Sequence, residues 1–294
     1  MNPDIVLVRR MRPLLGTWVE MRVEGPAARA ERAISAAFAQ IARVQRRMSF
    51  HDPDSVLSRI NLLAHHIPQP VDTWTWQVLR LALALSHASG GLFDITVGGE
   101  LVRRGVLPDH GFADSDAPGG CDAVELLPGR HVRLRRPVLL TLDGIAKGYA
   151  VDRAVRLLRA AGMERGVVNA GGDLRVFGPA SVPLAVRDAQ GRVRAAGQLD
   201  NAAVASSIIG HSTADRERFP ACLITPDAAE GGWHAVNNEE CPAIWSVQAR
   251  NCWKADALTK VAALAAPAER AQRIVRLGGR LLTPSGADAL RRAA

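Results

Sequence analysis

The sequence is poor in the residues that build several common kinds of site. Only four of its 294 residues are cysteines, and they form no CxxC pair and no zinc-finger spacing. This excludes a disulfide-rich scaffold and a zinc ribbon, and free thiols are typical of a reducing compartment. No apolar run approaches the ~20 residues that a membrane-spanning helix needs. We therefore expect no membrane span.

Two further scarcities concern the start of the chain and its positive charge. Ile5–Val8 is too short for the apolar core of a secretory signal, and Arg9 and Arg10 follow it, so we expect a cytoplasmic protein. Lysine occurs only three times, so the net charge of +8 comes almost entirely from arginine. The arginines are scattered, with no recognition motif and little aromatic interleaving. We expect no nucleic-acid partner, because an anionic small ligand explains the charge equally well.

The apolar fraction of 48% and the charged fraction of 22% are ordinary for a soluble globular enzyme. Apolar spacing predicts both helices and strands. The expected helices cover residues 27–47, 75–89, 149–161 and 267–277, and the expected strands cover 14–23, 138–142, 174–177 and 280–283 together with a hairpin within 182–199. Residues 101–136 lack a pattern and read as a surface excursion. We predict an α+β fold in which a largely antiparallel sheet, flanked by helices, forms a single domain over residues 1–294.

Two glycine-rich turns flank the helix expected from Tyr149. Gly144 and Gly148 bracket Lys147 before it, and Gly171-Gly172 follows it. Glycines expose backbone N–H groups, and a helix N-terminus adds partial positive charge, so this arrangement suits a phosphate. The alternative is that the glycines only make tight turns. The stretch has neither the GxxxxGK[ST] spacing of a Walker loop nor the GxGxxG of a dinucleotide fold.

Residues 143–152 and 169–173 resemble the signature of the ApbE family, the FAD:protein FMN transferases. That family carries a Gly-Ile-Ala-Lys-Gly-Tyr-Ala-Val-Asp turn and a later Asn-x-Gly-Gly-Asp segment. The resemblance extends over nearly the whole chain. It implies a T-fold-related α+β fold, FAD as substrate and a flavoprotein as acceptor; the oligomeric state stays open.

The resemblance also implies a set of flavin contacts. Leu15 stands where the family has a methionine that packs on the flavin, and Phe50 is expected to stack near its ring. The full set is Leu15, Phe50, Leu92, Phe93, Asp94, Thr141, Lys147, Asp173, Ser206 and Leu223. An aspartate inside an apolar run, such as Asp94, must be hydrogen-bonded. A ligand group or a simple turn satisfies it equally well.

The sequence departs from the family pattern in three places. Thr141 stands where relatives commonly have aspartate, and Asp143 follows two positions later. The family's His-Ile-x-Asp-Pro segment aligns with residues 222–226, so Cys222 replaces the histidine. His211 and His234 lie near enough in the chain to substitute for it. The expected catalytic residues are therefore Asp256, His211 and Cys222.

The third departure concerns the metal site. The family binds Mg²⁺ with an Ala-Asp-Ala-x-x-Thr helix, which implies Asp256, Thr259 and the Gly144 carbonyl as ligands here. The residue four after Asp256 is Lys260, however, and Thr259 is only three on. Both spacings share the aspartate's face of a helix. The competing hypothesis is that Lys260 pairs with Asp256 and fills the cation position, since a lysine and a metal ion there would repel.

The resemblance therefore predicts a Mg²⁺-dependent transfer of FMN from FAD to a threonine or serine of a target flavoprotein, with release of AMP. The departures keep an alternative open, namely a flavin-binding pseudoenzyme of the same family that lacks transferase activity.

Overall fold

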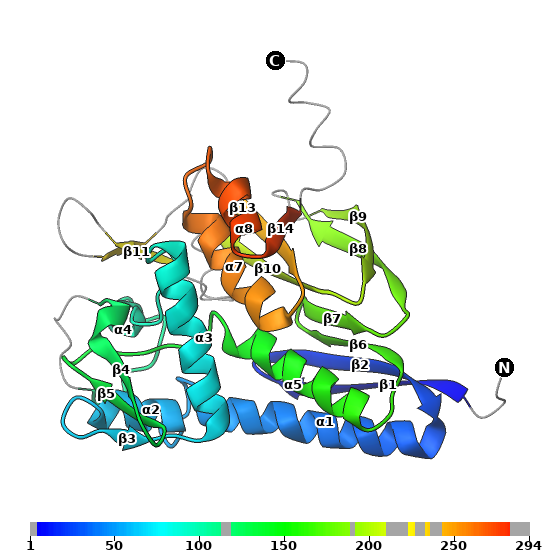
Figure 1. Ribbon diagram of the computed structural model, residues 1–294, viewed down its shortest axis with the longest axis horizontal. Helices are drawn as coiled ribbons and strands as arrows, with labels where there is room; N and C mark the ends of the chain where they lie inside the picture. The colour runs from blue at the N-terminus through cyan, green and yellow to red at the C-terminus, as the bar shows by residue number, and fades with distance from the viewer. Residues whose placement is uncertain are drawn as a thin grey trace. The chain divides into compact units, whose positions relative to one another are not determined.

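The computed structural model describes residues 5–112, 119–188, 192–209, 223–226, 233–235 and 243–282. The chain forms two compact units, each built from separate segments (Figure 1). The first unit contains residues up to 43, 147–208 and those after 240, and the second contains 44–146 and 209–240. The chain passes between the two units several times, so neither unit is one continuous segment. The single domain expected over residues 1–294 stays a prediction.

A seven-stranded sheet forms the framework of the first unit. Five neighbouring pairs in it, β1–β2, β2–β6, β6–β7, β7–β10 and β13–β14, run antiparallel. This confirms the predicted α+β fold with a largely antiparallel sheet. The strand order is β1 (Ile5–Leu14), β2 (Thr17–Pro26), β6 (Arg165–Ala170), β7 (Asp173–Phe177), β10 (Ala203–Ile209), β13 (Ala243–Ala249) and β14 (Gly279–Leu282).

The strand expected over residues 14–23 is wrong at its start. Leu14 pairs with Thr17, and the two residues between them form a tight turn in which Leu15 has φ 57° and Gly16 has φ 68°. Two successive positive φ angles match the right-handed twist of a two-residue hairpin. The alternation of apolar residues continues through this turn, so periodicity alone did not reveal it. Leu15, an expected flavin contact, therefore lies at the tip of the β1–β2 hairpin.

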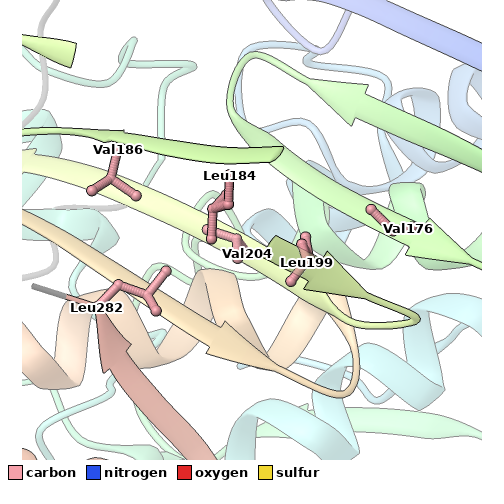
Figure 2. Packing of buried hydrophobic residues seen from close by; sticks show 6 residues of the cluster. All are labelled: Val176, Leu184, Val186, Leu199, Val204 and Leu282. Carbon is pink, nitrogen blue, oxygen red and sulfur yellow. The ribbon is translucent and has the colours of Figure 1, made fainter. Parts of the chain in front are cut away.

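A second hairpin, β8 (Ser181–Arg187) and β9 (Val193–Asp200), confirms the hairpin expected within 182–199. Its apolar residues pack with residues of the seven-stranded sheet in one buried cluster (Figure 2). The members of this cluster are Val176, Leu184, Val186, Leu199, Val204 and Leu282. Removing apolar surface from water in this way stabilises the layer by roughly 25 cal/mol per Å² buried.

Four helices accompany the sheet: α1 (Ala27–Met48), α5 (Ala146–Ala160), α7 (Cys252–Leu264) and α8 (Arg270–Arg276). They correspond to the expected helices, apart from α7, and α7 packs against β7, β13 and β14. Helix α5 begins at Ala146, three residues earlier than expected. Lys147 and Gly148 therefore lie in the first turn of the helix and not in a turn before it, which corrects the sequence interpretation.

The second unit contains the helices α2 (Val56–Leu63), α3 (Thr73–Ser89) and α4 (Gly98–Arg103). Its three-stranded sheet has the order β3 (Gln69–Pro70), β5 (His131–Leu134) and β4 (Val124–Leu127), and β11 (Ile224–Pro226) pairs with β12 (Trp233–Ala235). The surface excursion expected over 101–136 is thus partly wrong, because Val132 and Leu134 are buried in paired strands. Among the described residues, no helix has the length and apolarity that crossing a lipid bilayer requires.

Candidate functional site

The Gly171-Gly172 turn precedes Asp173, whose side chain is buried in the first unit. Ala170 pairs with Asp173 across this two-residue turn, whose glycines have φ 62° and 102°. Asn169 Oδ1 accepts a hydrogen bond from the Gly172 N–H at 2.9 Å, which fixes the turn. Asp173 is the first residue of β7, and only 1% of its surface is exposed. The Asn-Ala-Gly-Gly-Asp segment is therefore a hairpin turn that delivers one buried carboxylate.

The first turn of α5 lies directly against the first turn of α7. A Cβ atom on Gly148 would approach the Cys252 carbonyl oxygen to 2.4 Å, so no larger residue fits without a shift. The Gly148 N–H donates to Asp256 Oδ2 at 3.1 Å. Asp152, one turn further along α5, accepts from the N–H groups of Cys252 and Trp253 at 3.0 Å each. A carboxylate at this position satisfies N–H groups that α7 leaves without helical partners.

Helix α7 carries three of the expected site residues. Asp256 and Thr259 are buried, with 1% and 0% of their surfaces exposed. The Lys260 ammonium group forms an ion pair with Asp256 Oδ1 and also donates to the Asp256 carbonyl at 3.2 Å. This confirms the predicted pairing of Lys260 with Asp256. Thr259 donates its hydroxyl proton to the same carbonyl at 2.6 Å.

Two ammonium groups and two carboxylates thus gather in the first unit, and we call Lys147, Asp173, Asp256 and Lys260 the lysine–aspartate cluster. Lys147 Nζ lies 3.1 Å from Asp173 Oδ2. Burial lowers the pKa of Lys147, but the carboxylates of Asp173 and Asp256 outweigh burial and raise that pKa above its ordinary value. Burial, followed by the nearby Asp256 carboxylate, raises the pKa of Asp173 to about 6 despite Lys147 and Lys260. The four charges therefore act on one another.

Two hydroxyl pairs involve neighbouring residues of β10, and the first of them contacts the cluster through Thr259. The Ser207 hydroxyl lies 2.6 Å from Thr259 Oγ1, and the Ser206 hydroxyl lies 2.7 Å from Ser246 Oγ. Since Thr259 gives its only proton to the Asp256 carbonyl, Ser207 is the donor in the first pair. Ser206, an expected nucleotide contact, is thus held by a partner from β13 that the sequence did not suggest.

The second unit holds Asp94 through hydrogen bonds from neutral donors, and its charge also acts on the Arg136 guanidinium. Asp94 Oδ1 accepts from the Thr96 N–H at 2.7 Å, from the Thr96 hydroxyl at 2.6 Å and from Cys121 Sγ at 3.4 Å. The structure thus provides the turn that was one of the two expected ways to satisfy Asp94. Burial, followed by the Asp94 charge, raises the pKa of the Cys121 thiol to about 12.

The other expected residues of the second unit are mostly buried. Phe50 has no exposed surface, and its ring stacks on His110 with centroids 6.2 Å apart. Thr141 is buried and its N–H donates to the Ile95 carbonyl at 2.8 Å, whereas Asp143 is exposed. Asp143 therefore does not take the place of Thr141. Leu92, Gly144 and Leu223 are half-buried, and Phe93 is buried.

The expected residues are accordingly distributed over both units. The structure brings Lys147, Asp173, Asp256 and Thr259 together in the first unit, to which Ser206 also belongs. Gly144, the expected carbonyl ligand, belongs to the second unit, as do Phe50, Leu92, Phe93, Asp94, Thr141 and Leu223. His211 and Cys222 lie outside the described residues.

Sequence reasoning missed Asp152 and Arg175. These residues form an ion pair, and Asp152 joins α5 to the start of α7. The only available signal was the aspartate that closes the Gly-Tyr-Ala-Val-Asp segment. Burial raises the pKa of Asp152, although Arg175 and the two backbone N–H groups of α7 oppose this shift. Asp152 is thus a positioning residue for the helix that carries Asp256.

Comparison with known proteins gives relatives that share one description. FAD:protein FMN transferase from Treponema pallidum is 29% identical over 186 residues, which is 58% of this chain and 51% of that protein. The Rhodobacter capsulatus protein of the same description is 32% identical over 176 residues, 56% of this chain and 34% of that protein. The chain thus spans about half the length, or less, of these curated relatives.

Solved structures share the fold. The ApbE protein of Thermotoga maritima has a TM-score of 0.75 at 23% identity, covering 97% of this chain and 99% of that one. The apo form of the flavinyl transferase ApbE from Pseudomonas stutzeri has a TM-score of 0.74 at 20% identity, with 99% and 98% covered. The model of the ApbE family matches residues 15–281. With most of its length matched, and with the motif residues gathered in one buried cluster, the chain belongs to the ApbE family.

Proposed function

We propose that this chain is an FAD:protein FMN transferase, which moves FMN from FAD to a threonine or serine hydroxyl of an acceptor flavoprotein and releases AMP. Family membership and the description shared by the curated relatives support this activity. The observation that carries it is the lysine–aspartate cluster at the start of α5. There the Lys147 side chain is 33% exposed, and its ammonium group forms an ion pair with the buried Asp173.

The reaction needs positioning and charge neutralisation more than covalent chemistry by the protein. The acceptor hydroxyl oxygen forms a bond to the FMN phosphorus, the bond from that phosphorus to the AMP oxygen breaks, and the hydroxyl proton passes to a base. Lys147 would neutralise charge on the diphosphate, helped by the N-terminus of α5. His211 and Cys222 stay predicted catalytic residues, and neither is assigned here as the base.

Backbone N–H groups contribute less to the proposed phosphate site than the sequence suggested. The N–H groups of Ile145 and Ala146 donate to the Leu142 carbonyl at 3.0 and 2.8 Å. The Gly148 N–H is bound to Asp256. Three of the N–H groups in residues 144–148 therefore already have protein acceptors, so the Lys147 side chain becomes the main anion-binding group of this stretch.

The oxygen atoms that would bind Mg²⁺ do not fit a metal ion as they stand. One carboxylate oxygen of Asp256 is paired with Lys260 and the other accepts from Gly148, while the Thr259 hydroxyl is held by Ser207 and the Asp256 carbonyl. Mg²⁺ requires oxygen ligands at 2.0–2.1 Å in a near-octahedral arrangement. A divalent ion 4 Å from the Lys260 ammonium would be repelled by roughly 8 kcal/mol at an effective dielectric constant of 20.

The test is transfer to an acceptor. The purified chain would be incubated with FAD and a flavoprotein that carries the acceptor hydroxyl, and covalent FMN would be read from in-gel fluorescence and from the mass of the acceptor. We expect transfer by the natural chain and a loss of at least about a hundredfold in Lys147→Met, because one charge-neutralising group is worth about 2.7–4 kcal/mol. Lys254→Met, a change at another lysine, should transfer normally.

A second candidate function is a flavin-binding protein without transferase activity. The observation that favours it is the engaged state of Asp256, whose oxygen atoms all have protein partners. Tight FAD binding without any transfer to the acceptor would support this candidate. A chain that neither binds FAD nor transfers FMN would contradict both. The cytoplasmic location stays a prediction.

A further inference from the structure

We propose that the Lys260 ammonium group is the resident cation of this site and takes the place of a divalent metal ion. The chain would then bind the FAD diphosphate without any metal. The replacement of the metal ion by Lys260 concerns the protein alone, whereas metal-free FAD binding rests on the proposed function. Four observations lead to this inference.

The position of Lys260 is fixed by its own helix. Lys260 lies four residues after Asp256 in α7, so both side chains project from the same face. Its ammonium group contacts both a carboxylate oxygen and the backbone carbonyl of Asp256. The ion pair therefore forms within one turn and does not depend on the packing of distant segments. Only 21% of the Lys260 side chain is exposed.

The other oxygen atoms around Asp256 are also engaged. Asp256 Oδ2 accepts from the Gly148 N–H at 3.1 Å. Thr259 Oγ1 lies 2.6 Å from both the Asp256 carbonyl and the Ser207 hydroxyl. A metal ion bound to Asp256 and Thr259 would have to displace Lys260 and rearrange these bonds. Each oxygen atom of Asp256 therefore already has a protein partner without a metal ion.

Charge balance leads to the same conclusion. The lysine–aspartate cluster contains two ammonium groups and two carboxylates, which sum to zero. A divalent ion added to it would leave two uncompensated positive charges in a site where Asp173 and Asp256 are each only 1% exposed. Without Lys260 the same three remaining residues would sum to −1, a charge that attracts a cation. The lysine therefore decides whether the site takes a metal.

The spacing of residues along α7 explains how a lysine can take the place of a metal ion here. Thr259 uses its hydroxyl inside the helix, toward the carbonyl of the preceding turn. Lys260 occupies the position from which a threonine hydroxyl would reach the same side as the Asp256 carboxylate. Lys260→Thr thus supplies a short oxygen ligand and removes the competing charge in a single change.

The experiment measures metal binding by the full chain without flavin. The natural chain and the variants Lys260→Thr, Lys260→Arg and Lys254→Thr would be freed of metal with EDTA and titrated with Mn²⁺, with free Mn²⁺ followed by electron paramagnetic resonance. Lys254 lies on the same helix, with its ammonium group near the Trp253 ring, and serves as the matched control. Thermal melting curves would establish that each variant is folded.

We expect Lys260→Thr to bind Mn²⁺ at least about tenfold more tightly than the natural chain, since it loses a like charge next to the metal. Lys260→Arg keeps that charge and should bind no better than the natural chain, and Lys254→Thr should be unchanged. One tightly bound Mn²⁺ per natural chain, or equal affinities for the natural chain and Lys260→Thr, would overturn the proposal. If Lys260→Thr does not fold, the natural chain alone still decides. Tight Mn²⁺ binding by the natural chain overturns the proposal. No tight Mn²⁺ binding, together with FAD binding that is equal in EDTA and in Mg²⁺, supports the proposal.

A second measurement extends the test to the nucleotide. FAD binding to the natural chain, followed by quenching of flavin fluorescence, should be the same in EDTA and in excess Mg²⁺. A loss of about tenfold or more in EDTA would contradict metal-independent binding. The Mn²⁺ titration is independent of transfer to an acceptor. A chain without transferase activity therefore leaves the assignment of Lys260 intact, and an active chain that needs Mg²⁺ overturns the assignment while supporting the proposed function.

Discussion

The first unit satisfies its buried carboxylates with ammonium groups, whereas the second unit satisfies Asp94 with neutral donors. In the first unit, Asp173 faces Lys147 and Asp256 faces Lys260. In the second, Asp94 accepts from the Thr96 N–H, the Thr96 hydroxyl and the Cys121 thiol. A carboxylate paired with an ammonium group loses most of its compensation when that one partner is removed. A carboxylate with several weak donors loses only a fraction.

The difference also bears on what each unit can do. A charged cluster creates a strong local field and can exchange one of its internal ion pairs for an anionic ligand such as a diphosphate. The neutral donors around Asp94 shape a turn and offer no ammonium group to an anionic ligand. We therefore propose the first unit for the phosphate chemistry of the proposed function, whereas Asp94 has a local structural role in its turn and stays a predicted flavin contact.

The largest effect is expected from Lys147→Met. This change leaves the Asp173 carboxylate, 1% exposed, without its nearest positive charge. Removing one partner of a fully buried ion pair costs about 3–5 kcal/mol, and because 33% of the Lys147 side chain is exposed, the free energy of unfolding in urea should fall by at most that amount. Asp94→Asn, the matched change in the second unit, should cost about 1 kcal/mol because the backbone donor keeps an acceptor. Equal losses in the two variants would break the comparison.

The next prediction compares two glycines that lie in helices, one beside the charged cluster and one in the second unit. A Cβ atom at Gly148 would lie 2.4 Å from the Cys252 carbonyl oxygen, and one at Gly98 would lie 2.5 Å from the Leu139 carbonyl oxygen. Both Gly148→Ala and Gly98→Ala should therefore destabilise the chain by about 1–3 kcal/mol in urea unfolding.

Only Gly148→Ala should also weaken FAD binding, because it moves the N–H that holds Asp256 and shifts α5 against α7. Fluorescence titration with FAD would measure this difference. If Gly98→Ala weakened FAD binding as much as Gly148→Ala does, the charged cluster would not be the site of nucleotide binding.

Local sequence patterns predicted the contacts that form within one element. The pairing of Lys260 with Asp256 follows from a four-residue spacing on one helix, and the β8–β9 hairpin follows from alternation around a polar turn. These contacts need no knowledge of the tertiary fold. The Leu15-Gly16 turn was missed because the apolar alternation runs through it.

Contacts between distant segments could not be predicted in this way. The hydrogen bond from Gly148 to Asp256 joins residues 108 positions apart, and the bond between Ser207 and Thr259 spans 52. Gly148 suggested a phosphate turn because glycine serves equally well in turns and at close helix contacts. Only the packing of α5 against α7 shows that its role is the second.

The smallest effect concerns the reactivity of Cys121, whose thiol donates to the Asp94 carboxylate. Burial and the Asp94 carboxylate raise the pKa of the thiol to about 12. At pH 8 only about one molecule in ten thousand then carries the reactive thiolate, against roughly one in four for an ordinary cysteine. Alkylation of Cys121 by iodoacetamide, followed by peptide mass spectrometry, should therefore be much slower than that of free cysteine.

Asp94→Asn sharpens this prediction, because it removes the charge and leaves burial in place. Burial is the larger cause of the raised pKa, so the variant should react faster than the natural chain but still more slowly than free cysteine. Thr96→Val keeps the Asp94 charge and serves as the control, with little change expected in the rate. A reaction rate for the natural chain equal to that of free cysteine would show that the thiol is neither buried nor close to the carboxylate. In that case neutral donors would not describe how the second unit satisfies Asp94.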